Sequence, residues 1–180
     1  MQMPKSTGKP LPAGYGAPIL YLDFDGPLHY DNALRHPRRG VYLMAPPGYV
    51  LFQHVALLEC ALEPYPEVLI VLSTSWVKAL TFSRAKKRLT SNLQSRVIGA
   101  TYHTQMNRFN FEDMTRAEQI LDDVQRRRPR DWLALDNDGW QWPAVHRDHL
   151  VLTDDCDGLS VPEVLNEFRQ KLAAMCAVHT

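Results

Sequence analysis

The sequence predicts an α/β fold in which a Rossmann-like parallel sheet carries helices on both faces. Short, uniformly apolar runs recur along the chain, as is typical of strands that are buried on both faces of a sheet. Segments with helical spacing of apolar residues separate these runs. Polar side chains follow most of the runs, and parallel sheets bind their ligands beyond these carboxyl ends.

The individual elements follow from these patterns. We expect strands at residues 19–22, 68–72, 96–100, 132–135 and 150–152. We expect helices at residues 49–62, 76–89, 116–127 and 162–177, the third of them starting with a capping box between Thr115 and Glu118. Residues 26–48 and 101–114 are expected to form loops. Residues 1–17, rich in Pro and Gly, are expected to form a flexible arm before a single domain over residues 18–180.

Composition limits the functions that this chain can have. Twenty Lys and Arg residues balance twenty Asp and Glu residues, which argues against a protein that coats nucleic acid through bulk charge. The three cysteines form no CxxC pair, so we expect reduced thiols in a cytoplasmic protein. The longest apolar run is far too short to span a membrane, and no membrane partner is expected.

Carboxylates at two predicted strand ends give the strongest chemical signal. Asp23 and Asp25 follow the first strand, and Asp136 follows the strand at 132–135. Several such charges in one crevice need a counter-ion, so we expect all three to contribute to a Mg²⁺ site. A carboxylate beside Mg²⁺ is a competent nucleophile towards phosphorus, and Asp23 is the candidate. Asp25 is placed to act as general acid and then as general base, and Gly26 lets the chain turn away.

Two further groups complete the candidate site. Ser73 offers a hydroxyl and backbone amides at a helix N-terminus, a suitable cradle for phosphate oxygens, with Thr74 as the rival assignment. We expect both to bind substrate together with Gly26, and Ser73 also to take part in catalysis. Arg116 is the best candidate for the missing cation, although an arginine in a first helical turn can also be a plain surface residue.

These motifs resemble those of the haloacid dehalogenase (HAD) superfamily of phosphohydrolases over residues 18–168. The first motif is Asp-Phe-Asp-Gly-Pro-Leu at 23–28, the second is Ser73, and the fourth is Leu-Asp-Asn-Asp at 135–138. The third motif is normally a lysine at a helix start, and this chain has Arg116 there. The segments LDFDG, LSTSW, RVIGAT, ALD and GLS are most similar to small HAD domains found with RNA repair proteins.

The resemblance implies a Mg²⁺-dependent phosphomonoester hydrolase that forms an aspartyl-phosphate on Asp23. Neither 25–49 nor 73–116 has room for a full cap domain, so we expect a capless or minimally capped site. An open site in similar enzymes accompanies large phosphorylated substrates, including RNA or DNA ends. Asp138 or Asp154 could join the metal site. The alternative is a domain that keeps the fold and binds phosphate or a partner without turnover, and Arg116 in place of lysine favours it.

Aromatic and histidine residues near the motifs allow two interpretations. Trp76, Trp140 and Trp142 could stack on a nucleobase, but we expect them to pack against the sheet. His29 and His36 could touch substrate, and we interpret both as surface residues.

Charged clusters also have a structural and a functional interpretation. The Asp-x-Asp motif alone could be a solvated turn. The basic run at 126–130 could meet nucleic-acid phosphates, but such runs more often end a helix. The acidic segment at 154–157 resembles a calcium loop only superficially, because the required glutamate is absent.

Overall fold

The computed structural model describes residues 10–177, and its centre is a five-stranded sheet of order β5-β4-β1-β6-β7. All neighbouring strands are parallel. The strands are β1 (Pro18–Leu22), β4 (Leu69–Leu72), β5 (Val97–Ala100), β6 (Asp131–Asp136) and β7 (Leu150–Leu152). The predicted α/β, Rossmann-like class is therefore confirmed, and each expected strand is present.

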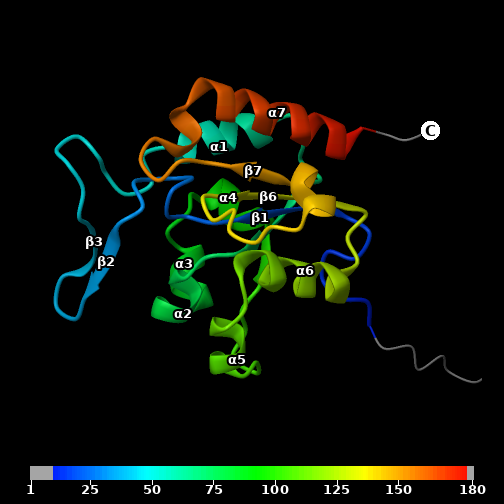
Figure 1. The fold of residues 1–180 in the computed structure, drawn as a ribbon, viewed down its shortest axis with the longest axis horizontal. Coiled ribbons are helices and arrows are strands. Elements are labelled where there is room, and N and C mark those ends of the chain that lie inside the picture. Colours follow the sequence, from blue (N-terminus) through cyan, green and yellow to red (C-terminus); the bar gives the residue numbers. More distant parts are fainter. Residues whose placement is uncertain (1–9, 178–180) are drawn as a thin grey trace, which may run out of the picture.

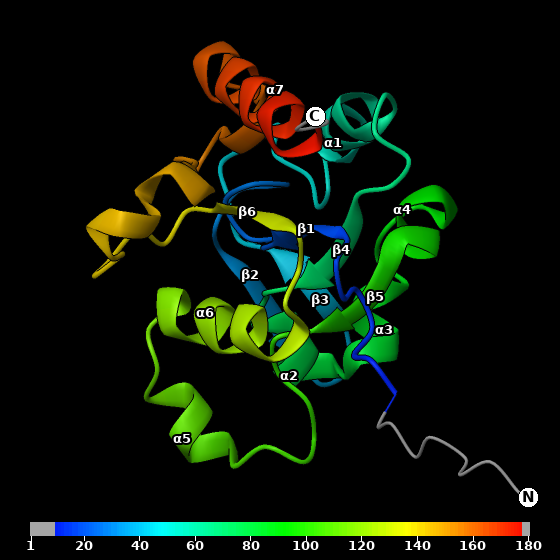
Figure 2. The same ribbon diagram turned by 90° about the vertical axis from the view of Figure 1, so that its right-hand side faces the viewer.

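Helices cover both faces of this sheet. They are α1 (Val55–Leu62), α2 (Trp76–Leu80), α3 (Phe82–Lys86), α4 (Ser91–Arg96), α5 (Arg108–Glu112), α6 (Arg116–Arg127) and α7 (Pro162–Cys176). Figures 1 and 2 show α1 and α7 together on one face and α6 on the other. Two short 3₁₀ turns, η1 (Ala144–His149) and η2 (Gly158–Ser160), flank β7. Among the residues described, no helix has the length and apolar character needed to cross a membrane.

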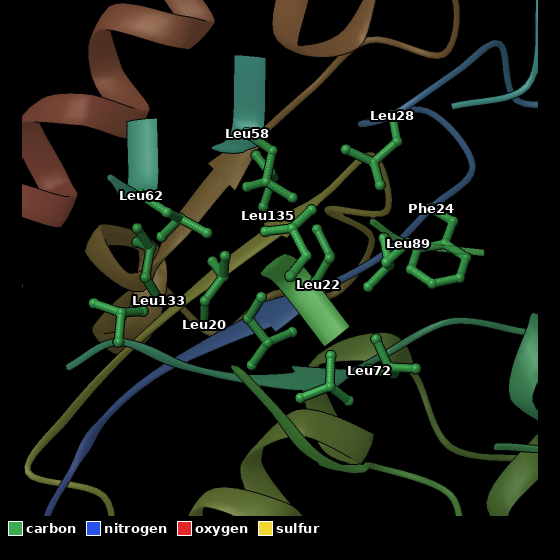
Figure 3. Packing of buried hydrophobic residues seen from close by; sticks show 14 of the residues in the cluster. Leu20, Leu22, Phe24, Leu28, Leu58, Leu62, Leu72, Leu89, Leu133 and Leu135 are labelled. Atoms are coloured by element: carbon green, nitrogen blue, oxygen red, sulfur yellow. The ribbon is translucent and has the colours of Figure 1, made fainter. Parts of the chain in front are cut away.

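The central strand β1 is buried on both faces because its side chains alternate between two apolar clusters. Leu20 and Leu22 pack with side chains of α1 and α7, and Figure 3 shows them among leucines from several elements. Ile19 and Tyr21 lie in the second cluster, with Ile120 of α6. Asp23, which follows β1, thus lies at the end of a strand that is packed on both faces.

Two predicted helices differ from expectation because of single backbone positions. The helix expected at 49–62 begins only at Val55, since Phe52 has a left-handed φ of 59°. The helix expected at 76–89 is broken at Thr81, where φ is 121° and ψ is 156°. The Thr81 hydroxyl then caps α3 by accepting from the amide of Arg84.

The expected loop at 26–48 instead contains an antiparallel hairpin of β2 (Ala33–His36) and β3 (Gly40–Leu43). These strands have four residues each and are only partly buried, so they leave no apolar run in the sequence. In Figure 1 the hairpin stands apart from the sheet at the left of the view. The loop expected at 101–114 likewise contains α5, whose first amides bond to the side chain of Asn107.

Helix α6 starts at the predicted residue, and its last turn bonds to the segment before β1. The capping box of Thr115 and Glu118 starts α6, as predicted. The Gly16 amide donates to the carbonyl of Arg128 at 3.0 Å, and Arg127 donates to the carbonyl of Ala13 at 2.8 Å. Residues 1–9 of the expected arm lie outside the described part.

Candidate active site

The backbone ladder of the sheet continues one residue past the strands and aligns the motif residues. The amide of Asp23 donates to the carbonyl of Leu135 at 3.1 Å, and the amide of Ser73 donates to that of Leu22 at 2.8 Å. Asp136 ends β6, the strand that pairs with β1. Asp23, Ser73 and Asp136 therefore lie side by side at the carboxyl edge of the sheet, as the sequence predicts.

Arg116, the first residue of α6, reaches both buried carboxylates. Its Nη2 lies 3.4 Å from Oδ2 of Asp23, and its Nε lies 3.1 Å from Oδ2 of Asp136. Gln119 accepts from Nη1 of Arg116 at 3.3 Å and donates to two backbone carbonyls of the preceding segment. Gln119 was not anticipated, because a polar residue of an amphipathic helix is ordinarily expected on the solvent face.

One guanidinium does not neutralise these buried carboxylates. Burial raises the pKa of Asp23 to about 6; the attraction of Arg116 opposes this rise but is outweighed by burial, to which repulsion from Asp25 adds. Burial and repulsion from Asp23 raise the pKa of Asp136 well above its ordinary value. Burial alone would lower the pKa of Arg116, but the carboxylates outweigh it and raise that pKa. The site therefore has an excess of negative charge that a cation would relieve.

The donor set fits Mg²⁺. Asp23 and Asp136 offer hard oxygen atoms and each sends one of them to the same guanidinium. A hollow of about 400 Å³ opens beside them and is lined by Asp25, Asp31 and Asp138, among others. Within residues 10–177 no three His, Cys, Asp or Glu side chains form a complete metal cluster. The protein would thus supply two carboxylates and leave further positions to phosphate and water.

The two other proposed metal ligands differ in their surroundings. Asp138 lines the hollow, whereas the Asp154 carboxylate accepts from the amides of Cys156 and Asp157 at 2.7 Å each. Both bonds go to Oδ1 of Asp154 and make the 154–157 segment a turn that is closed by its own backbone amides.

Both oxygens of Asp25 contact ring nitrogens of other side chains. Nε1 of Trp76 donates to Oδ2 at 2.8 Å, and Nε2 of His29 lies 3.0 Å from Oδ1. His29 returns to Asp25 because the chain turns at Gly26, whose φ is 83° and whose amide donates to the His29 carbonyl. His29 is fully buried, so its interpretation as a surface residue is wrong. Asp25, included among the expected metal ligands, has its side chain directed to the ring nitrogens of Trp76 and His29.

Three hydroxyl residues, Ser73, Thr74 and Ser75, follow β4, and they differ in how close they lie to the hollow. Ser73 Oγ is buried and has no hydrogen-bond partner among the described residues. A hydrogen bond from Thr74 helps to lower the pKa of Asp23, and Ser75 lines the hollow. Thr74, the rival assignment, and Ser75, which was not anticipated, are therefore the hydroxyl groups nearest the open space.

A second groove of about 290 Å³ adjoins the hollow and shares Ser75, Arg116 and Asp138 with it. Trp140 lines this groove and is 67% exposed, so the expected packing against the sheet is wrong for this residue. The expectation holds for Trp76 and Trp142, which are buried.

The basic run at 126–130 ends α6, as expected. Arg126 and Arg127 both pair with the buried carboxylate of Asp123 on their own helix. The single carboxylate of Asp123 thus compensates one of these two positive charges.

A family model described as "HAD domain in Swiss Army Knife RNA repair proteins" matches residues 19–164. The matched range contains every motif residue discussed above and most of the chain. No curated protein and no solved structure shows significant similarity to it.

Proposed function

The chain belongs to the family of HAD domains in Swiss Army Knife RNA repair proteins, and from this we propose that it is a Mg²⁺-dependent phosphomonoester hydrolase for nucleic-acid ends. The family membership confirms the resemblance predicted from the motifs. The observation that carries the proposal is the contact of one guanidinium, that of Arg116, with both Asp23 and Asp136. Beside this pair, Asp25 is held in place by hydrogen bonds to the ring nitrogens of Trp76 and His29.

In the first half of the reaction, an Asp23 oxygen attacks phosphorus and forms an aspartyl-phosphate. The bond from phosphorus to the ester oxygen breaks, and the protonated Asp25 carboxyl gives its proton to that leaving oxygen. Arg116 offsets negative charge on the phosphoryl oxygens, and the hydroxyls of Thr74 and Ser75 are placed to donate to them.

In the second half, Asp25 acts as a base. Its carboxylate takes a proton from water, whose oxygen attacks the phosphorus of the aspartyl-phosphate. The bond from phosphorus to Asp23 breaks, which releases inorganic phosphate, restores the Asp23 carboxylate and leaves Asp25 protonated for the next turnover. Asp23 and Asp136 would hold Mg²⁺, which supplies charge compensation and alignment of the phosphoryl group when bound.

The shape of the site supports a large substrate. Between Asp25 and α1 the chain inserts only the β2–β3 hairpin, and the hollow beside Asp23 stays open. A phosphorylated end of a polymer could enter such a site while the rest of the polymer stays outside. The description of the family as RNA repair proteins supports an RNA or DNA end.

The test is phosphate release from a panel of esters, with Mg²⁺ and with EDTA, for wild type and Asp23→Asn. The panel contains an aryl phosphate, nucleotides, and oligonucleotides with a 3′- or 5′-phosphate. We expect Mg²⁺-dependent release, preference for an oligonucleotide, and no turnover by the variant. Release by Asp23→Asn at the wild-type rate would refute the assignment of the nucleophile.

A second outcome would favour a binding domain without turnover. The arginine at the position of the usual motif lysine is the feature that suggests it. If the chain is such a binding domain, the folded protein will bind Mg²⁺ and phosphate but release no phosphate from any ester.

A further inference from the structure

A groove of about 470 Å³ lies between the β2–β3 hairpin and α3 and is strongly basic. Four of its lining residues are Arg35, Arg84, Lys87 and Arg88, and none is Asp or Glu. The chain as a whole carries equal numbers of basic and acidic residues. The concentration of one sign of charge in this groove is therefore a local feature, and it favours an anionic ligand.

The cations of this groove are available to a ligand. Arg84 and Lys87 are exposed, and neither forms an ion pair within residues 10–177. Arg126 and Arg127, by contrast, are already paired with Asp123. A polyanion in the groove would not have to displace an internal carboxylate.

The groove is fixed next to the catalytic hollow. Arg35 on β2 donates to the carbonyl of Ala79 on α2 at 2.7 Å, which ties the hairpin to the helix. Residues of the hairpin and of α3 line the groove together, so these two segments lie beside each other. Asp31 lines the catalytic hollow, and Arg35 is four residues further along, which separates their Cα atoms by at most about 14 Å.

A chain of contacts also joins the two. The Arg88 guanidinium lies 5.7 Å from the ring centroid of Trp76, whose Nε1 donates to Asp25. Arg88, which lines the groove, is thus connected through Trp76 to Asp25, the proposed general acid.

We propose that this groove binds the phosphodiester backbone of a single-stranded nucleic acid whose phosphorylated end lies in the catalytic hollow. The inference rests on the proposed function. Repeated phosphates match repeated Arg and Lys side chains, and a few nucleotides span the short distance to the hollow. A larger groove of about 820 Å³ shares Arg35 and Leu80 with this one and also has no acidic lining residue, so the strand can continue there.

The test compares two double variants with equal changes in net charge. The groove variant is Arg84→Ala with Lys87→Ala, and the control is Arg130→Ala with Arg169→Ala, two exposed residues outside both basic grooves. Arg88 is left unchanged because it contacts Trp76. Binding of a 12-nucleotide single strand without a terminal phosphate is measured by fluorescence anisotropy between 50 and 200 mM salt.

We expect the groove variant to bind at least about tenfold more weakly at 50 mM salt than wild type, while the control stays within about twofold. Each single-strand phosphate contact adds about 0.7 to the slope of log K against log salt, so loss of two contacts reduces it by about 1.4. The KM for a phosphorylated 12-mer should rise, and hydrolysis of an aryl phosphate should stay unchanged.

Three results would overturn the inference: no binding of the strand by wild type, equal losses in both variants, or equal affinity for a poly-glutamate peptide. The last would indicate an acidic protein as the ligand. Aryl-phosphate hydrolysis by the same wild-type preparation separates the two proposals, because its absence counts against the phosphatase and leaves the binding result intact.

Discussion

Nε1 of Trp76 lies 2.8 Å from Oδ2 of Asp25 and fixes the carboxyl group that we assign as general acid. The indole cannot easily turn away, since Phe24 and Phe52 pack edge-on against it with centroids 5.8 and 5.3 Å distant. Trp76, which we expected only to pack against the sheet, therefore also positions Asp25.

Replacing Trp76 with Phe keeps an aromatic ring and removes the donor. We expect kcat to fall about tenfold to a hundredfold on an alkyl or oligonucleotide phosphate, because a hydrogen bond to a charged group contributes about 1.5–3 kcal/mol. The loss should be much smaller on p-nitrophenyl phosphate, whose leaving oxygen needs little protonation. The measurement is kcat on both substrates.

The matched control is Trp142→Phe, which removes an equivalent buried indole donor to the carbonyl of His146, away from the site. If both substrates lose the same factor in Trp76→Phe, the indole has only a structural role.

Arg116 provides the second prediction because its guanidinium spans two carboxylates through two different nitrogens. Arg116→Ala should lower kcat by at least about a hundredfold, the size of effect seen when a preorganised charge-stabilising donor is removed. Arg116→Lys keeps the charge but lacks the planar fork, so we expect an intermediate loss. Arg108→Lys, on an exposed residue of α5 paired with Glu112, is the control and should leave turnover unchanged. Wild-type activity in Arg116→Ala would remove this residue from the mechanism.

The stability of the metal-free protein should depend on pH through Asp23. The pKa of this buried group is about 6 in the folded chain, so the folded state holds a proton that the unfolded state has released between about pH 4 and 6. This proton stabilises the folded state below about pH 4, and the stabilisation is lost as the pH rises through about 6. Ionised Asp23 thus destabilises the folded, metal-free protein at neutral pH.

Asp23→Asn should then be more stable than wild type in EDTA at pH 7, with the advantage shrinking towards pH 4. Between pH 4 and pH 7, the difference in the free energy of unfolding between the variant and wild type should change by on the order of 1–3 kcal/mol. Urea denaturation at several pH values measures this change. Mg²⁺ should stabilise wild type and not the variant, because it binds the folded carboxylate pair. A difference between the two proteins that does not vary with pH would contradict the prediction.

Much of the fold and the motif positions could be predicted because both depend on local sequence. Buried parallel strands leave uninterrupted apolar runs, and Asp23, Ser73 and Asp136 follow such runs directly. The capping box of α6 is likewise encoded within four residues, Thr115 to Glu118.

The features that were missed depend on contacts between distant segments. The half-exposed hairpin has no apolar run, and the break at Thr81 is a single backbone conformation. His29 lies only four residues from Asp25, yet its burial follows from the turn at Gly26 and from Phe52 and Trp76 packing against its ring. No spacing rule relates Trp76 to Asp25, which are 51 residues apart.

Trp140 is exposed beside the groove that adjoins the catalytic hollow, which leads to a prediction about substrate recognition. If the terminal base stacks on it, Trp140→Ala should cost about 1–3 kcal/mol of binding free energy and so raise KM for a phosphorylated oligonucleotide roughly 5- to 150-fold. Aryl-phosphate kinetics should not change. Phe109→Ala, at an exposed aromatic residue outside both hollows, is the control. An unchanged KM for the oligonucleotide would exclude stacking on Trp140.

Gly158 links the loop after β7 to the turn that follows the nucleophile. A Cβ at this position would lie 2.2 Å from the carbonyl oxygen of Gly26 and 2.6 Å from that of Pro27, and the φ of 45° already disfavours a side chain. The neighbouring Leu159 amide donates to the Pro27 carbonyl at 3.1 Å, so the two segments cannot simply separate. Gly158→Ala must displace the turn that positions Asp25.

We therefore expect Gly158→Ala to lower the free energy of unfolding by about 2–4 kcal/mol and to reduce kcat together with stability. Gly40→Ala is the matched control, because Gly40 has a φ of 78° but nothing within 4 Å of a Cβ. That variant carries only the conformational cost of a left-handed residue, about 1–2 kcal/mol, and should keep its activity. Urea denaturation and aryl-phosphate turnover measure both effects. Equal losses of stability in the two variants, with activity intact in both, would show that the Gly158 contact does not position the active-site turn.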